Sequence, residues 1–165
     1  MVFAPRALER RVKCRSFYFD LGLLEDYWTK RKYHHTMSST LVYALDEALA
    51  MVEEEGVEAR AARHERNHLA FADALAARDL SLLPPKGERL WTLNAVRVPD
   101  GVDEAAVRKH LLEEFGIEIG AGLGPLAGKI WRIGLMGASS TPRLIALLLG
   151  ALDSALAAQR RRVHA

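Results

Sequence analysis

One arginine lies on an otherwise apolar stretch of this chain. In the run KIWRIGLM, Trp131, Ile133 and Leu135 alternate to one side, and Arg132 takes the other side. Gly134 follows on the side of the arginine and leaves room beside the guanidinium. A guanidinium donates two parallel hydrogen bonds to a carboxylate, so this pattern predicts a site for a small carboxylate. The alternative is an arginine at a sheet edge that pairs with a nearby acid.

A second polar group, Tyr33-His34-His35-Thr36, precedes the first long predicted helix. Hydroxyl and imidazole groups beside a helix N-terminus are suited to binding a phosphate. The alternative, which these four residues alone favour, is an N-capping loop around a buried aromatic side chain.

The run His64-Glu65-Arg66-Asn67-His68 matches the pattern H-E-x-x-H. On a helix the two imidazoles share one face, as in zinc peptidases, where the glutamate acts as general base. The downstream glycine and histidine of one peptidase class, the metzincins, are replaced here by Phe71 and Ala74. We therefore predict a surface amphipathic helix with two half-exposed histidines, and a zinc peptidase is a remote alternative.

The glycine-rich loop at residues 120–128 resembles two kinds of phosphate-binding loop and is neither. A dinucleotide-binding loop opens a helix, whereas Pro125 and the strand pattern after it exclude a helix here. A P-loop needs Ser or Thr after its lysine, and Ile130 follows Lys129. We expect tight turns in this loop, or a backbone that closely approaches a ligand.

Helical and strand periodicities divide the rest of the chain. Residues 1–32 are aromatic-rich and show neither period, so we expect an irregular segment there. Two helices are expected next, and after the Pro84–Pro85 pair the expected order is strand, helix, strand, strand, helix. The expected elements cover residues 38–55, 57–78, 91–98, 103–115, 117–119, 129–136 and 141–159.

This order predicts an α/β (α+β) fold, with a helical hairpin followed by a small, mostly antiparallel sheet of β-α-β-β-α order. The helices are expected on one face of that sheet. In its first strand, Trp91, Leu93 and Ala95 are expected to form the apolar side.

Composition sets few further limits. The 165 residues carry a net charge of +2 and half are hydrophobic, as in ordinary globular proteins. The single cysteine, Cys14, excludes an internal disulfide and a CxxC site. Without a run of about 18 apolar residues no membrane span is expected. Both ends of the chain are basic, but no aromatic residues interleave with the tail arginines at 160–162, so we favour solvated termini over nucleic-acid binding. The N-terminus has no signal-peptide core, so the expected location is cytoplasmic.

Taken together, these segments resemble one family. SFYFDL, then YHHT and its helix, then the block GIEIGAGLGPLAGKIWRIGLMG and a final helix, are similar to the C-terminal portion of alanine–glyoxylate / serine–pyruvate aminotransferases. These are class V, fold-type I enzymes that depend on pyridoxal 5'-phosphate (PLP). The resemblance runs from about residue 5 to residue 158, which is nearly the whole chain.

The resemblance implies roles for three residues. Arg132 would bind the α-carboxylate of the amino-acid or 2-oxo-acid substrate. Tyr33 and Thr36 would contact the PLP phosphate of the neighbouring subunit, so the active site would need a homodimer. Neither a metal ligand nor a catalytic residue is expected in this chain.

The resemblance also implies a division of the chain. Residues 1–36 would be a remnant of the large PLP-binding domain, and residues 37–84 would be connecting helices. Residues 85–160 would form the small C-terminal α+β domain, followed by a tail over residues 161–165.

The lysine that forms a Schiff base with PLP would lie upstream of residue 1, because none of the six lysines matches its motif. The expected function is that of the C-terminal segment of a transaminase, acting from alanine or serine to glyoxylate or pyruvate and inactive alone. Two alternatives stay open: a non-catalytic dimerisation module from a truncated gene, and the zinc peptidase.

Overall fold

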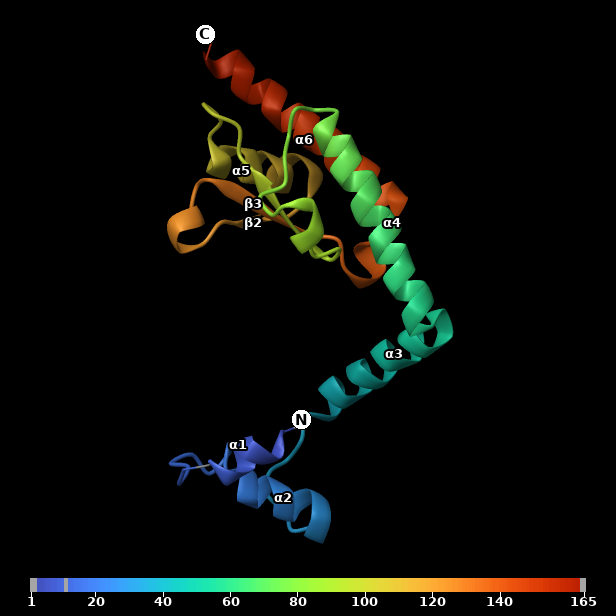
Figure 1. Ribbon diagram of the computed structural model, residues 1–165, viewed down its shortest axis with the longest axis vertical. Helices are drawn as coiled ribbons and strands as arrows, with labels where there is room; N and C mark the ends of the chain where they lie inside the picture. Colours follow the sequence, from blue (N-terminus) through green and yellow to red (C-terminus); the bar gives the residue numbers. More distant parts are fainter. Residues whose placement is uncertain (1–2, 11, 164–165) are drawn as a thin grey trace. The chain divides into compact units, whose positions relative to one another are not determined.

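The structure is a computed structural model that describes residues 3–10 and 12–163. It divides into two compact units, Met1–Met51 and Val52–Ala165, and the boundary lies inside helix α3 (Ser39–Glu55) (Figure 1). The predicted domain boundaries after residues 36, 84 and 160 stay predictions, because this division does not show which domain of a larger protein a segment belongs to.

The first unit contains two short helices where the sequence predicted an irregular segment. Helix α1 covers Pro5–Glu9 and helix α2 covers Leu21–Lys30. The carboxylate of Asp20 caps α2, since it accepts hydrogen bonds from the backbone N–H groups of Gly22 and Leu23 at 2.8 and 3.1 Å. The prediction was wrong because the many aromatic residues obscured both this cap and the helical spacing.

The two long helices predicted after this segment are both present. Helix α3 begins after Ser38, whose hydroxyl accepts a hydrogen bond from the N–H of Leu41 at 3.4 Å. Gly56, with a φ of +80°, separates it from helix α4 (Val57–Ala76), and glycine adopts this conformation without strain. No residue of α3 is buried, and its apolar side chains Leu41 and Leu49 are 70% and 53% exposed.

The second unit contains a three-stranded antiparallel sheet. Its order is β1 (Leu93–Arg97), β3 (Ile130–Gly134), β2 (Gly120–Ala121), so β3 is the central strand. Helix α5 (Glu104–Phe115) follows β1, and helix α6 (Pro142–Val163) follows β3. The chain order is therefore the predicted β-α-β-β-α order, and α4 runs alongside α6 (Figure 1).

Helices α4, α5 and α6 all contribute to the core on one face of the sheet. Trp131 and Ile133 of β3 point into this core, and the indole N–H of the fully buried Trp131 donates to the carbonyl oxygen of Glu104 at 3.3 Å. The helical residues of the core are Phe71, Leu75, Val107, Leu111, Ile145, Leu148, Leu149, Ala151, Leu152 and Ala155. The mixed fold with helices on one face of the sheet is thus confirmed.

Helix α6 is rich in apolar residues. Over Pro142–Arg160 it has the length and mean hydropathy of a membrane-spanning helix, which the sequence analysis did not expect. Ile145, Leu149 and Leu152 are buried against the sheet and its neighbours. Core packing therefore accounts for these apolar residues.

The predicted apolar side of β1 was wrong. Asn94 and Val96 are buried, whereas Leu93 is exposed. The register places Asn94 opposite Ile133 and Val96 opposite Trp131. Directly opposed residues of antiparallel strands point to the same face, so the side chains opposite the core residues of β3 must enter the core.

The short strand predicted at residues 117–119 begins later, at Gly120. Gly116 ends α5 in the left-handed conformation, with a φ of +64°. The N–H of Ile117 then bonds back to the carbonyl oxygen of Leu111 at 3.0 Å. Residues 117–119 therefore belong to the exit from the helix, and only two residues remain to pair with β3.

Candidate functional site

Arg132 lies at the centre of the sheet, on the face opposite Trp131 and Ile133. Its backbone is paired with Ala95 of β1 on one side and with Gly120 of β2 on the other. Its Nε donates a hydrogen bond to the carbonyl oxygen of Ala121 at 2.7 Å. This bond orients the guanidinium and uses only one of its five N–H groups.

The room for this guanidinium is provided by Gly120, which the sequence analysis missed. A Cβ atom at Gly120 would lie 3.2 Å from Nη2 and 3.3 Å from Nε of Arg132. The space beside Gly134, predicted to be open, is filled by Met136, whose terminal methyl would lie 2.8 Å from a Cβ there. That prediction was wrong, because spacing along one strand does not reveal which residue of the neighbouring strand is opposite.

The alternative of a sheet-edge arginine paired with an acid does not fit the structure. Strand β3 is central, and no Asp or Glu among residues 3–10 and 12–163 forms an ion pair with Arg132. The side chain is only partly exposed. A partly buried guanidinium with its terminal amino groups unused by acids is suited to binding a carboxylate.

The hydroxyl groups of Tyr33 and Thr36 lie together in the first unit. Their oxygens are 2.9 Å apart, and both residues are exposed. The structure thus brings these two predicted site residues together, whereas Arg132 belongs to the second unit. Two neighbouring exposed hydroxyls can both donate hydrogen bonds to one phosphate group.

The two histidines between them are turned inward and hold the loop in place. Nε2 of the buried His34 donates to the carbonyl oxygen of Phe17 at 3.0 Å, so its Nδ1 is the acceptor for Nδ1–H of His35 at 2.7 Å. The Phe17 ring stacks on the His34 ring with centroids 4.5 Å apart. The imidazoles therefore anchor the loop to the preceding segment, and the hydroxyls of Tyr33 and Thr36 stay accessible.

The two histidines of the H-E-x-x-H pattern are buried, not half-exposed as predicted. His64 is 7% and His68 is 3% exposed. Nδ1 of His64 donates to the carbonyl oxygen of Arg60 at 2.7 Å, and its Nε2 accepts from the N–H of Gly137 at 3.0 Å. His68 bonds through Nδ1 to the side-chain oxygen of Asn94 at 2.7 Å.

These hydrogen bonds argue against the zinc peptidase. Both ring nitrogens of His64 are already used, so this histidine has no lone pair for a metal ion. Within the part of the chain that the structure describes, no three His, Cys, Asp or Glu side chains are grouped to hold one. The prediction of half-exposed histidines failed because the strand and the loop that cover them are distant in the sequence.

The glycine-rich loop is tightly turned, as predicted. A Cβ at Gly122 would lie 1.9 Å from the carbonyl oxygen of Leu126, so the backbone closely approaches itself there. Gly124 and Gly128 have φ angles of +53° and +73°. The loop needs its glycines for these turns, which explains the pattern without a bound phosphate.

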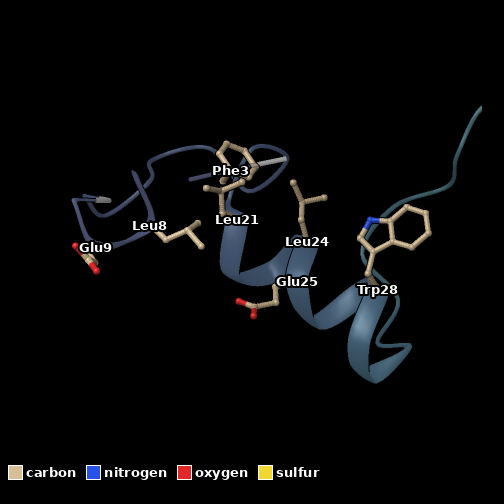
Figure 2. Close-up of a pocket in the computed structure, with 7 residues that line it drawn as sticks. All are labelled: Phe3, Leu8, Glu9, Leu21, Leu24, Glu25 and Trp28. Carbon is tan, nitrogen blue, oxygen red and sulfur yellow. The ribbon is translucent and has the colours of Figure 1, made fainter. Parts of the chain in front are cut away.

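An open hollow of about 570 Å³ lies in the first unit and is mostly apolar. Its lining residues are Phe3, Leu8, Glu9, Leu21, Leu24, Glu25 and Trp28 (Figure 2). Its ionisable lining side chains are the carboxylates of Glu9 and Glu25, and the described lining residues include no cationic group that could bind a phosphate or a carboxylate. Its exposed apolar side chains resemble a surface that packs against further protein.

Comparison with known proteins addresses the family. No protein-family model matches the chain. The (S)-ureidoglycine–glyoxylate transaminase of Bacillus subtilis (strain 168) is 44% identical over 142 residues, which cover 86% of this chain and 34% of that protein. The alanine–glyoxylate aminotransferase of Drosophila melanogaster is 37% identical over 163 residues, which cover 93% and 41%. The crystal structure of alanine–glyoxylate aminotransferase from Nostoc sp. matches with a TM-score of 0.88 at 44% identity, over 93% of this chain and 42% of that one.

The chain is a homologue of class V, PLP-dependent aminotransferases. This confirms the resemblance drawn from YHHT and from the block around Arg132. The chain spans less than half the length of the relatives it matches. Their activities and substrates therefore enter only as proposals for this chain.

The residues of this segment fit one end of PLP. The paired hydroxyls of Tyr33 and Thr36 match its phosphate group. All six lysines are exposed, and the hydrogen bond with Asp26 raises the pKa of Lys30. A lysine that reacts with a carbonyl group is desolvated in a pocket, so these exposed lysines do not fit the other end of the cofactor.

Proposed function

We propose that this chain is the C-terminal segment of a PLP-dependent aminotransferase that moves an amino group from alanine or serine to glyoxylate or pyruvate. The observation that carries this proposal is the partly buried guanidinium of Arg132, oriented by the Ala121 carbonyl and unpaired with any acid in the described chain. Two homologous enzymes are named for glyoxylate, a small 2-oxo acid, which is consistent with a site built around one carboxylate.

In this proposal Arg132 binds and orients the substrate. Its terminal amino groups donate to the α-carboxylate of the amino acid or 2-oxo acid, while Nε stays bonded to Ala121. Tyr33 and Thr36 donate to the PLP phosphate of the neighbouring subunit, so the working enzyme is a homodimer. When bound, PLP supplies the electron sink that amino-group transfer requires.

A binding experiment tests the role of Arg132 directly. Pyruvate is titrated into the chain with ¹⁵N-labelled arginine, and the Nε–H signal of Arg132 is followed by NMR. We expect a saturable shift of this signal, and we expect Arg132→Met to abolish pyruvate binding when binding is measured by calorimetry. Arg97→Met is the matched control, because Arg97 is an exposed arginine on the neighbouring strand β1. Absence of any pyruvate effect on Arg132 would contradict the proposed substrate site.

We further propose that the chain alone does not catalyse transamination, because the lysine that binds PLP belongs to a part of the enzyme outside these residues. The assay mixes the purified chain with PLP, alanine and glyoxylate and measures pyruvate and glycine. We expect no product above the rate without protein. Turnover by the chain alone would refute this part of the proposal.

A second candidate function is a non-catalytic dimerisation module, and the exposed apolar residues favour it. Phe19, Trp28 and Leu41 are large and exposed in the described chain. Apolar surface of this kind is usually covered by another protein surface. Light scattering after size-exclusion chromatography tests this candidate, because a stable monomer at micromolar concentration would count against it. A cytoplasmic location is part of the proposal and is checked by cell fractionation.

A further inference from the structure

Three side chains of helix α4 form hydrogen bonds with the 137–140 loop, which follows the strand that carries Arg132. Nη1 of Arg63 donates to the carbonyl oxygens of Gly137 and Ser140 at 3.0 and 2.8 Å. His64 accepts from the N–H of Gly137 at 3.0 Å, and the amide of Asn67 donates to the Ser140 carbonyl oxygen at 2.7 Å. The backbone of residues 137–140 is therefore bonded to α4 by four hydrogen bonds across more than 70 residues of sequence.

The other side of the Arg63 guanidinium binds the end of helix α3. Nε and Nη2 of Arg63 contact the two carboxylate oxygens of Glu55, and Arg60 adds a third hydrogen bond at 2.9 Å. The hydrogen bond from Arg63 holds the pKa of Glu55 below its usual range. A bidentate pair of this kind fixes the plane of the guanidinium, so Nη1 is aimed at the loop.

This loop continues directly from the central strand. Strand β3 ends at Gly134, and the N–H of Leu135 still bonds to the carbonyl oxygen of Thr92 at 2.8 Å. Gly137 has a φ of +55°, so the chain turns sharply at the residue that His64 and Arg63 hold. The hydrogen bonds from α4 thus fix the C-terminal end of the strand that carries Arg132.

We propose that Arg63 and His64 are positioning residues for the carboxylate-binding arginine, acting through the 137–140 loop and strand β3. The H-E-x-x-H pattern is accordingly part of a hydrogen-bond network, formed by Arg63, His64 and Asn67 with the 137–140 loop, and not a metal site. The link to catalysis rests on the proposed function, because it assumes that Arg132 binds the substrate carboxylate. The effect of this network on Arg132 is measurable without substrate.

The substrate-free test uses the hydrogen bond between Arg132 and Ala121. Exchange of the Arg132 Nε–H with solvent is measured by NMR in the full chain, in Arg63→Lys and in the control Arg66→Lys. Arg66 lies on the exposed side of the same helix. A lysine cannot bridge Glu55 and the loop at once, so we expect exchange about fivefold faster or more in Arg63→Lys, with helix α5 amides and the Arg66→Lys control unchanged.

A conservative pair of variants tests His64. His64→Gln keeps an acceptor for the Gly137 N–H, whereas His64→Leu removes it. We expect near-normal exchange at Arg132 in the first variant and faster exchange in the second. Unchanged exchange in Arg63→Lys and in His64→Leu, or an equal rise at α5 amides, would overturn the positioning role, since the latter indicates general loosening.

Pyruvate titration then separates this inference from the proposed function. If Arg63→Lys weakens pyruvate binding about threefold or more while the chain stays folded, the positioning role extends to the substrate. If exchange at Arg132 rises in Arg63→Lys but the unaltered chain binds no pyruvate, the proposed function fails, while the conclusion that Arg63 positions Arg132 is retained. If pyruvate binds equally well to both forms, Arg63 does not position the substrate arginine.

Discussion

Replacing Arg132 by lysine should weaken substrate binding without unfolding the sheet. The guanidinium spends one N–H on the Ala121 carbonyl at 2.7 Å and keeps its terminal amino groups for a carboxylate. A lysine ammonium is a single point, so it either bonds to Ala121 or contacts the substrate, and it cannot present a parallel pair of donors. At least one charge-assisted hydrogen bond is therefore lost, which is worth about 1.5–3 kcal/mol.

That loss corresponds to an increase in KM of about ten- to one-hundredfold, at about 1.4 kcal/mol per factor of ten. The carboxylate is bound in both the ground state and the transition state, so kcat should change much less than KM. The assay is steady-state transamination between alanine and glyoxylate by the complete enzyme in which we propose this segment works. Both substrates should show the increase, because both carry an α-carboxylate.

The matched control is Arg97→Lys, an exposed arginine on strand β1 of the same sheet. An unchanged KM in Arg132→Lys would refute the reasoning, and so would an equal increase in Arg97→Lys. A fall in kcat with constant KM would place Arg132 in a transition-state interaction and would also contradict a simple carboxylate-binding role.

Three further predictions concern stability. Gly122→Ala should destabilise the second unit by about 3 kcal/mol or more in urea unfolding, because its Cβ would lie 1.9 Å from a backbone oxygen; a loss within error would contradict the close approach. Asn94→Ala should lower the free energy of unfolding by about 1–3 kcal/mol, because it leaves the buried Nδ1 of His68 unpaired. Replacing both Asn94 and His68 by leucine should lower it by less than the single change does. The Glu55 pKa is lowered by Arg63, so its stabilising effect should be full well above about pH 4.3 and vanish as pH falls through the lowered pKa. The difference in Tm between the unaltered chain and Glu55→Gln should accordingly shrink from pH 6 to pH 3, and a constant difference would argue against the pair.

The sequence predicted the central strand of the site well and its neighbours poorly. Alternation in KIWRIGLM correctly placed Trp131 and Ile133 on one face and Arg132 on the other, because side chains alternate along any strand. The same rule failed for β1, where a buried asparagine replaces an apolar residue at an inward position. Only the register with β3 and the hydrogen bond to His68 reveal that Asn94 points inward.

The candidate site shows the same limit at the level of contacts. The helical spacing of His64 and His68 was read correctly, but their partners lie at Gly137 and Asn94, far along the chain. Gly120 was missed for this reason as well, since its importance comes from standing opposite Arg132. Residue types and spacing indicated which side chains share a face. The residues that contact this face are distant in the sequence, so only the folded structure reveals them.

The buried Trp131 is an intrinsic fluorescent probe of the sheet. Its indole is fully buried in the core of the second unit, whereas Trp28 in the first unit and Trp91 in the second are exposed to solvent. A soluble quencher of fluorescence would therefore reach Trp28 and spare Trp131 in the native chain. Loss of this protection on heating would therefore report the unfolding of the sheet, without any label.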